Sequence, residues 1–293
     1  MKKLIAIIAF VGIAAGVLSA RVVRKKLDIL QGSVPETEII APETMEFVYD
    51  YRYCVDTTDA LKDNYEGDNM LLQIGPDGLS KFSSFKNLTV DSIIANTSFD
   101  QLQNAAAEGK LSNGEFMTIY KNYPQGKLIH TEKICMDWFR YEEDMPDFGW
   151  ELIDSTVTVL GYRCQGARCS FRGRQWTAFY AEDIPLTDGP WKFHGLPGLI
   201  MKASDEKGHY TFECIGIKSA ATRPVTIYKV PFNITDRRSY YDTRHRYEIN
   251  PYAYFEATGA GHITVTDEAG NPTLDAYDPI DLSFDYIERD WKK

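Results

Sequence analysis

The chain has 293 residues, of which 44% are hydrophobic and 13% aromatic, so it carries enough apolar material for one large domain or two small ones. Its formal net charge is −10. Removing residues 1–20 takes away two lysines, which leaves 30 basic and 42 acidic residues and a charge of −12. This acidity argues against nucleic acid and anionic membrane surfaces as partners, because both carry negative charge themselves.

The first twenty residues have the pattern of a secretory signal peptide. Lys2 and Lys3 precede the uncharged apolar stretch 4–18, and Ser19-Ala20 offers a small-residue cleavage site. A basic run at 21–26 follows directly, so an uncleaved inner-membrane anchor is the alternative, although the apolar stretch is short for a membrane span. We therefore predict export to the periplasm or the outer cell envelope.

Residues 21–44 are polar and contain proline, and we expect them to form a flexible segment on the surface. A single β-rich domain is predicted over 45–293. It opens with strict alternation, in which Phe47, Tyr49, Tyr51 and Tyr53 share one face of a strand.

Short β-type runs separated by turn residues continue along the chain. We predict strands at 70–74, 79–85, 116–120, 128–136, 156–160, 162–171, 175–180, 199–203, 210–217 and 225–230, and a last hairpin near 263–266. Helices are predicted at 98–108, where Ser98 and Gln101 fit a capping box, and at 235–247. The fold class is therefore mainly β with a few helices, and antiparallel.

Five cysteines occur, at 54, 135, 164, 169 and 214, so an oxidising compartment leaves at least one unpaired or paired with another chain. Cys164 and Cys169 are five residues apart in one predicted strand, which places them on opposite faces. A bridge from Cys164 to a neighbouring strand, for instance to Cys214, is easier to form. Core cysteines without any bridge are the alternative.

The most informative block is 188–200, Asp-Gly-Pro-Trp-Lys-Phe-His-Gly-Leu-Pro-Gly-Leu-Ile. Pro197-Gly198 suits the centre of a type II turn, in which glycine takes a positive φ. The flanking residues are apolar and prefer burial. We expect a loop of fixed backbone shape that packs inside the protein or against a partner.

Four blocks, at 70–84, 160–180, 181–200 and 277–282, resemble the GLPGLI family of secreted proteins and follow the family order. Cys169 departs from the family pattern. The resemblance implies secretion in Gram-negative bacteria and brings no established activity. The order of strands is also similar to the periplasmic lipoprotein-carrier architecture, an incomplete antiparallel β-barrel over an apolar cavity; a β-sandwich is the alternative.

The leading hypothesis is a binding or carrier protein for an apolar or lipid-like ligand. Tyr49 and Tyr51 would line its cavity together with aromatic residues of the 170–200 region, although alternating aromatics are also typical of an ordinary core. Arg172 and Arg174 could grip an anionic group, or could simply be the charged tip of a hairpin. The predicted binding residues are Arg172, Arg174, Trp176, Tyr180, Trp191, Phe193, His194, Gly195, Leu196, Pro197, Gly198 and Leu199.

Two further hypotheses stay open. In one, the 188–200 loop docks a partner such as an outer-membrane protein. In the other, His194 is the centre of an enzyme or metal site; its alternative role is a hydrogen bond that holds the loop. No nucleophile motif occurs, and the five histidines are scattered, so we predict no cofactor and no metal. Glu142-Glu143-Asp144 is interpreted as a solvated loop rather than an acid/base pair.

Overall fold

The computed structural model describes residues 34–42, 45–54, 65–98, 114–218, 223–259 and 285–292. The predicted signal peptide, most of the helix predicted at 98–108, the hairpin near 263–266 and the 277–282 block lie outside these ranges. Within them, no helix is long and apolar enough to cross a membrane.

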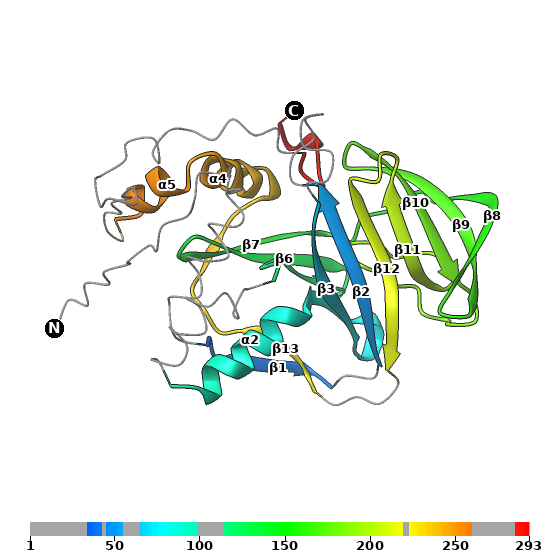
Figure 1. Cartoon of the computed structure of the whole chain (residues 1–293), viewed down its shortest axis with the longest axis horizontal. Helices are drawn as coiled ribbons and strands as arrows, with labels where there is room; N and C mark the ends of the chain where they lie inside the picture. Colours follow the sequence, from blue (N-terminus) through cyan, green and yellow to red (C-terminus); the bar gives the residue numbers. More distant parts are fainter. Residues whose placement is uncertain are drawn as a thin grey trace, which may run out of the picture.

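One large sheet dominates the described part of the chain (Figure 1). Its twelve strands pair antiparallel, apart from the parallel pair β14–β7. In spatial order they are β14 (Phe232–Ile234), β7 (Asp137–Asp144), β6 (Lys127–Ile134), β5 (Thr118–Lys121), β4 (Ser80–Ser84), β3 (Tyr65–Ile74), β2 (Met45–Cys54), β12 (Tyr210–Lys218), β11 (Leu199–Asp205), β10 (Arg174–Ala181), β9 (Tyr162–Phe171) and β8 (Glu151–Val159). The sheet is not closed into a barrel. The predicted mainly β, antiparallel and incomplete architecture is confirmed.

The aromatic alternation of β2 defines the inner face of this sheet. Tyr49, Tyr51 and Tyr53 are almost completely buried, and their neighbours across the pairing are buried on the same side. Tyr51 lies opposite Asp68 of β3 and Phe212 of β12. Because side chains alternate along a strand, Asp50 and Arg52 lie on the opposite, outer face.

A second, small sheet pairs β1 (Thr37–Ala41) with β13 (Val225–Tyr228). The strand β1 corrects the expectation of a flexible segment over 21–44, at least for these five residues. Its Ile39-Ile40 pair has the β-branched character that strands favour. Lys81 of β4 donates to the Thr226 carbonyl at 2.8 Å, which ties the small sheet to the large one.

Three α-helices are described: α2 (Phe85–Asn96), α4 (Arg237–Ile249) and α5 (Pro251–Ala257). Two single 3-10 turns are also described, η2 (Pro76–Gly78) before α2 and η4 (Asp290–Lys292) after α5. The helix α4 confirms the one predicted at 235–247, and Asp236 caps it by accepting from the Ser239 amide at 2.9 Å. The helix α2 was not predicted, because its apolar residues show no helical period.

The 188–200 loop lies in the core against the inner face of the sheet. The Phe193 ring stands 4.9 Å from Trp176, 5.1 Å from Trp191 and 6.2 Å from Phe212, between ring centroids. These spacings are those of aromatic rings in direct contact. The loop therefore fills space that an open curved sheet would otherwise leave exposed.

The two glycines of the loop serve different purposes, and this corrects the predicted turn. Gly195 has a φ of +91° and open space around it, so its freedom of backbone conformation is what the loop uses. Gly198 does not have a positive φ. A side chain at Gly198 would place its Cβ 2.3 Å from the Ala181 carbonyl oxygen, so glycine is required there by close backbone approach.

Candidate functional site

The aromatic residues predicted to line a cavity are part of the main core. Tyr49, Tyr51, Trp176, Tyr180, Trp191 and Phe193 are each at most 4% exposed and belong to one cluster of packed apolar side chains. Leu196 and Leu199 join the same cluster, while Gly195 and Pro197 are exposed. This is a correction: the rings pack on one another instead of facing a space, which favours the alternative of an ordinary core.

Two buried lysines hold the loop in place. The Lys121 ammonium of β5 pairs with the Asp188 carboxylate and donates to the carbonyls of Gly189 at 2.6 Å and Phe193 at 3.2 Å. Burial lowers the pKa of Lys121, and Asp188 opposes that shift by favouring the charged form. Lys121 thereby satisfies one end of the loop's backbone.

Lys192 anchors the centre of the loop. Its ammonium pairs with Glu143 of β7 and lies 2.6 Å from Glu288, and the side chains of Lys192 and Glu288 are both 0% exposed. Tyr141 accepts a further hydrogen bond from Lys192 at 3.1 Å. Burial works to raise the pKa of Glu288, but Lys192 and Arg237 outweigh it and hold that pKa below its usual value.

Glu143 was expected in a solvated loop together with its two acidic neighbours. These residues instead end β7, where alternation turns Glu143 inward so that its side chain is only 15% exposed. It meets Lys192 and also Arg172, whose Nη2 lies 2.5 Å from the carboxylate. The run of three acidic residues concealed this alternation of inward and outward positions.

Arg172 and Arg174 form ion pairs with carboxylates of the same chain, whereas the sequence had suggested that they could bind an anionic ligand. Arg174 is completely buried and contacts Asp205 at 2.6 Å and Asp285 at 2.8 Å. Arg172 lies 3.5 Å from Glu288. The Arg289 amide also donates to the Arg172 carbonyl at 2.8 Å. The β9–β10 turn is therefore the docking site of the segment 285–292, which lies beside α4 in Figure 1.

His194 holds the loop by its backbone and shows little capacity for acid–base chemistry. Trp150 Nε1 donates to the His194 carbonyl at 2.9 Å. Burial, together with Lys121, lowers the pKa of His194 to about 4, so the imidazole is neutral near pH 7. Within the described ranges, no group of three or more His, Cys, Asp or Glu side chains is placed to hold a metal ion.

All five cysteines are buried and form no disulfide. Cys164 and Cys169 were predicted on opposite faces of their strand, yet both belong to the main core cluster. The burial pattern of β9 changes phase at Gly166-Ala167, beside an irregularity in the pairing of β8 with β9. That change turns both thiols inward, and burial raises the pKa of each.

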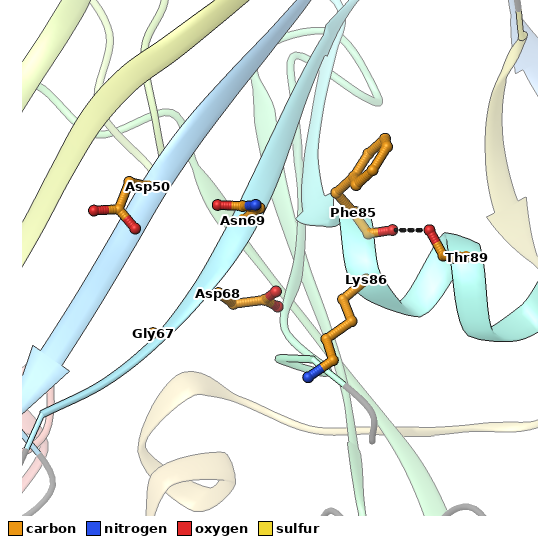
Figure 2. Close-up of a pocket in the computed structure, with 7 residues that line it drawn as sticks. All are labelled: Asp50, Gly67, Asp68, Asn69, Phe85, Lys86 and Thr89. Atoms are coloured by element: carbon orange, nitrogen blue, oxygen red, sulfur yellow. Dashed lines mark hydrogen bonds between the residues drawn. The ribbon is translucent and has the colours of Figure 1, made fainter. Parts of the chain in front are cut away.

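A pocket that the sequence did not reveal is lined by residues of the strands β2 and β3 and of the helix α2 (Figure 2). Its volume is about 440 Å³, within the range of small-molecule sites. The lining residues are Asp50 of β2, Gly67, Asp68 and Asn69 of β3, and Phe85, Lys86 and Thr89 of α2. Figure 2 shows the side chains of Asp68 and Lys86 extending into the space between β3 and α2.

Gly114 and Glu115 hydrogen-bond to both walls of this pocket. The Glu115 amide donates to Asp68 at 2.8 Å on the sheet side. On the helix side, Asn87 accepts from the Gly114 amide and donates to the Glu115 carbonyl, both at 2.7 Å. Ser84 caps the helix by accepting from the Asn87 amide at 3.0 Å. These hydrogen bonds hold β3 and α2 at a fixed distance from each other.

The pocket escaped sequence reasoning because its residues come from two strands and a helix that had no amphipathic pattern. One local signal was available: Gly67-Asp68-Asn69 is a run of strand-disfavouring residues inside a strand. Glycine inside a strand often marks a position that a ligand or another backbone segment approaches closely.

Comparison with known proteins adds a family of unknown function. Residues 170–202 match the family described as "Protein of unknown function (Porph_ging)". The matched stretch runs from the end of β9 through the 188–200 loop into β11. Among curated proteins, none matches this chain.

Two solved structures were also found. "Structure of PNGF-II in P21 space group" is 13% identical, with a TM-score of 0.48. "Structure of PNGF-II in C2 space group" is 14% identical, with a TM-score of 0.43. In both cases 68% of this chain aligns with 32% of the other, so this chain spans about a third of that protein. TM-scores this low do not define a shared fold.

The ion pair between Lys192 and Glu288 generates a prediction about stability. Glu288→Gln removes the charge and leaves the buried Lys192 ammonium with one carboxylate, so we expect a loss of about 3 kcal/mol in the free energy of unfolding. Glu151→Gln is the control, because Glu151 and its partner Arg168 are 67% and 63% exposed. That change should cost less than about 1 kcal/mol. Urea unfolding measures both, and equal losses would contradict the assignment.

The lowered pKa of His194 predicts a dependence of stability on pH. The unfolded chain binds a proton at His194 near pH 6.5, whereas the folded chain binds it near pH 4. Between these values the unfolded state holds more protons, so stability is complete above pH 6.5 and falls as the pH falls towards 4. His194→Gln removes this contribution. Between pH 7 and pH 4 the free energy of unfolding of the wild type should therefore fall by about 3 kcal/mol more than that of the variant. Parallel unfolding curves for the two proteins would contradict it.

Proposed function

We propose that this protein is an exported binding protein of the cell envelope, rather than an enzyme, and that it binds a small polar ligand in the pocket between β3 and α2. The observation that carries the proposal is the lining of that pocket. Asp50, Asn69 and Lys86 contribute a carboxylate, an amide and an ammonium, and none of the three forms a side-chain hydrogen bond or ion pair with the described residues. Polar groups held around a preformed hollow without partners are suited to a ligand.

The proposal of export rests on the residues before the described part of the chain. The basic start, the apolar stretch 4–18 and Ser19-Ala20 support a cleaved signal peptide, with an inner-membrane anchor as the alternative. We further propose membership of the GLPGLI family, which the motif at 188–200 supports. The matched stretch 170–202 contains that motif and belongs to a family of unknown function.

The packing of the 188–200 loop favours this polar site over the other hypotheses. An apolar or lipid ligand would need the space that Trp176, Trp191 and Phe193 fill with one another. Docking of an outer-membrane protein would need several exposed apolar side chains on the loop, whereas Leu196 is 2% exposed and Pro197 alone is an exposed apolar side chain between Trp191 and Ile200. Catalysis at His194 would need a stronger base than one with a pKa of about 4.

Native mass spectrometry of the protein recovered from its own cells tests this function. We expect a small polar molecule to remain bound. If the signal peptide is cleaved, the intact mass should be that of a chain whose N-terminal residue is Arg21. Asn69→Tyr places a large side chain in the pocket from an exposed strand position and should abolish the bound species. Asn233→Tyr is the matched control, because Asn233 is exposed on β14, away from the pocket.

A lipid or another apolar molecule bound equally to wild type and Asn69→Tyr would overturn the proposed site in favour of an apolar carrier. Protein that carries nothing, and that binds none of a set of small polar metabolites in solution, would overturn the proposed function altogether.

A further inference from the structure

We infer that the surface beneath the segment 285–292 is a peptide-binding groove, and that the partner it fits is a second copy of this chain. In such a pair of copies, each groove takes the segment 285–292 of the neighbour in place of its own. The groove is a different site from the β3–α2 pocket, so the inference does not rest on the proposed function. It is carried by the contacts of the segment, by the charge of the groove and by the length of the chain that joins them.

The backbone of the segment is held as that of a bound peptide is held. The segment contains one 3-10 turn, η4, and pairs with no strand of the described part of the chain. Arg174 of β10 donates to its backbone, at 3.0 Å to the Ile287 carbonyl and at 2.6 Å to the Tyr286 carbonyl. These partners are 113 and 112 positions apart in sequence. Contacts of this kind do not require the groove and the segment to belong to one molecule.

Apolar side chains of the segment are anchored in the body of the protein. Trp291 is 6% exposed, and its ring stacks on Tyr241 of α4 with 6.0 Å between the ring centroids. Ile287 is also 6% exposed and belongs to the main core cluster. Buried aromatic and aliphatic anchors of this kind supply most of the affinity in peptide recognition.

The groove is positively charged, although the protein as a whole is acidic. Four cations of the body contact the segment: Arg172, Arg174, Lys192 and Arg237. Within the described ranges, the carboxylates of the body that pair with them are Glu143 and Asp205, so the cations are in excess by two.

The segment brings the missing negative charge. Asp285 lies 2.8 Å from Arg174. Glu288 and Asp290 each lie 2.7 Å from Arg237. Complementary charge of this kind selects an acidic partner and fixes its register. The chain that carries this complement is the protein itself, which is why a second copy is the partner that the groove fits.

The connection between the body and the segment is long enough for an exchange. Residues 260–284, 25 in all, join Gly259 to Asp285. Fully extended, such a stretch reaches about 90 Å, whereas a compact protein of this length is about 50 Å across. The same tether keeps the segment near its own groove at an effective concentration on the order of 1 mM. Exchange therefore prevails where copies are concentrated, or where docking within one chain has been weakened.

A charge-swapped pair of full-length variants tests the exchange. Arg237→Asp reverses a charge of the groove and Asp290→Arg reverses its partner in the segment, so either variant alone has only mismatched pairs. In the mixture, the unaltered groove of one variant meets the unaltered segment of the other, and the two altered sides also match. We expect mixed dimers in sedimentation velocity at concentrations about 10-fold below those at which either variant alone dimerises.

Arg238→Asp is the matched control, because Arg238 is the exposed neighbour of Arg237 on α4. Mixed with Asp290→Arg, it should give no mixed dimer, since a copy with Arg238→Asp keeps its own segment docked. Mixed dimers in this control would show that surface charge alone drives the association, and they would overturn the inference. So would the absence of mixed dimers from the charge-swapped pair when circular dichroism shows both variants to be folded.

A second measurement serves if a charge-reversed variant does not fold. A protease site inserted after position 275 of the otherwise unaltered full-length chain is cut once the protein has folded, and a labelled synthetic peptide of residues 276–293 is added. We expect the labelled peptide to replace the cut fragment, and Glu288→Gln in the peptide to weaken its binding about 100-fold. A groove that does not take up the labelled peptide would overturn the inference.

Discussion

A single buried ammonium, that of Lys192, ties together the parts of this molecule that are farthest apart in sequence. It lies between Trp191 and Phe193, so those rings cannot enter the core unless the charge enters with them. A buried charge is tolerated only when it is paired and hydrogen-bonded. The partners are Glu143 of β7 and Glu288 near the C-terminus. The loop, the far edge of the sheet and the C-terminal segment therefore assemble together or leave a charge without compensation.

This arrangement gives the two faces of the sheet different roles. The inner face is filled by the protein's own aromatic loop, and the backbone of Trp191 adopts a φ of +52°, which a bulky residue takes only when its surroundings hold it. Away from this core, a hollow between the strands β2 and β3 and the helix α2 is lined by polar side chains. The conspicuous motif thus accounts for the architecture, while the candidate for binding lies among residues that form no motif.

Features that depend on residues close in sequence could be predicted, whereas contacts between residues far apart in sequence could not. The alternation in β2, the hairpins and α4 follow from local period and capping, and they could be predicted. Arg174 could be recognised as a group that binds anions, but its partner Asp285 lies 111 positions away and shares no local pattern with it. The pocket was missed for the same reason, because its lining residues are brought to one place only by strand pairing and by the placement of α2. Cys164 and Cys169 misled because strict alternation fails where the pairing of β8 with β9 is irregular.

Hydrogen exchange measured by mass spectrometry tests most directly whether the 188–200 loop is a permanent part of the core. If the buried lysines hold it as described, amides of 191–200 should exchange as slowly as those of the central strand β2, through global unfolding alone. They should also be unaffected by any ligand that protects the β3–α2 pocket. Fast exchange of the loop while β2 stays protected would show that the loop opens by itself, and that result would contradict the account.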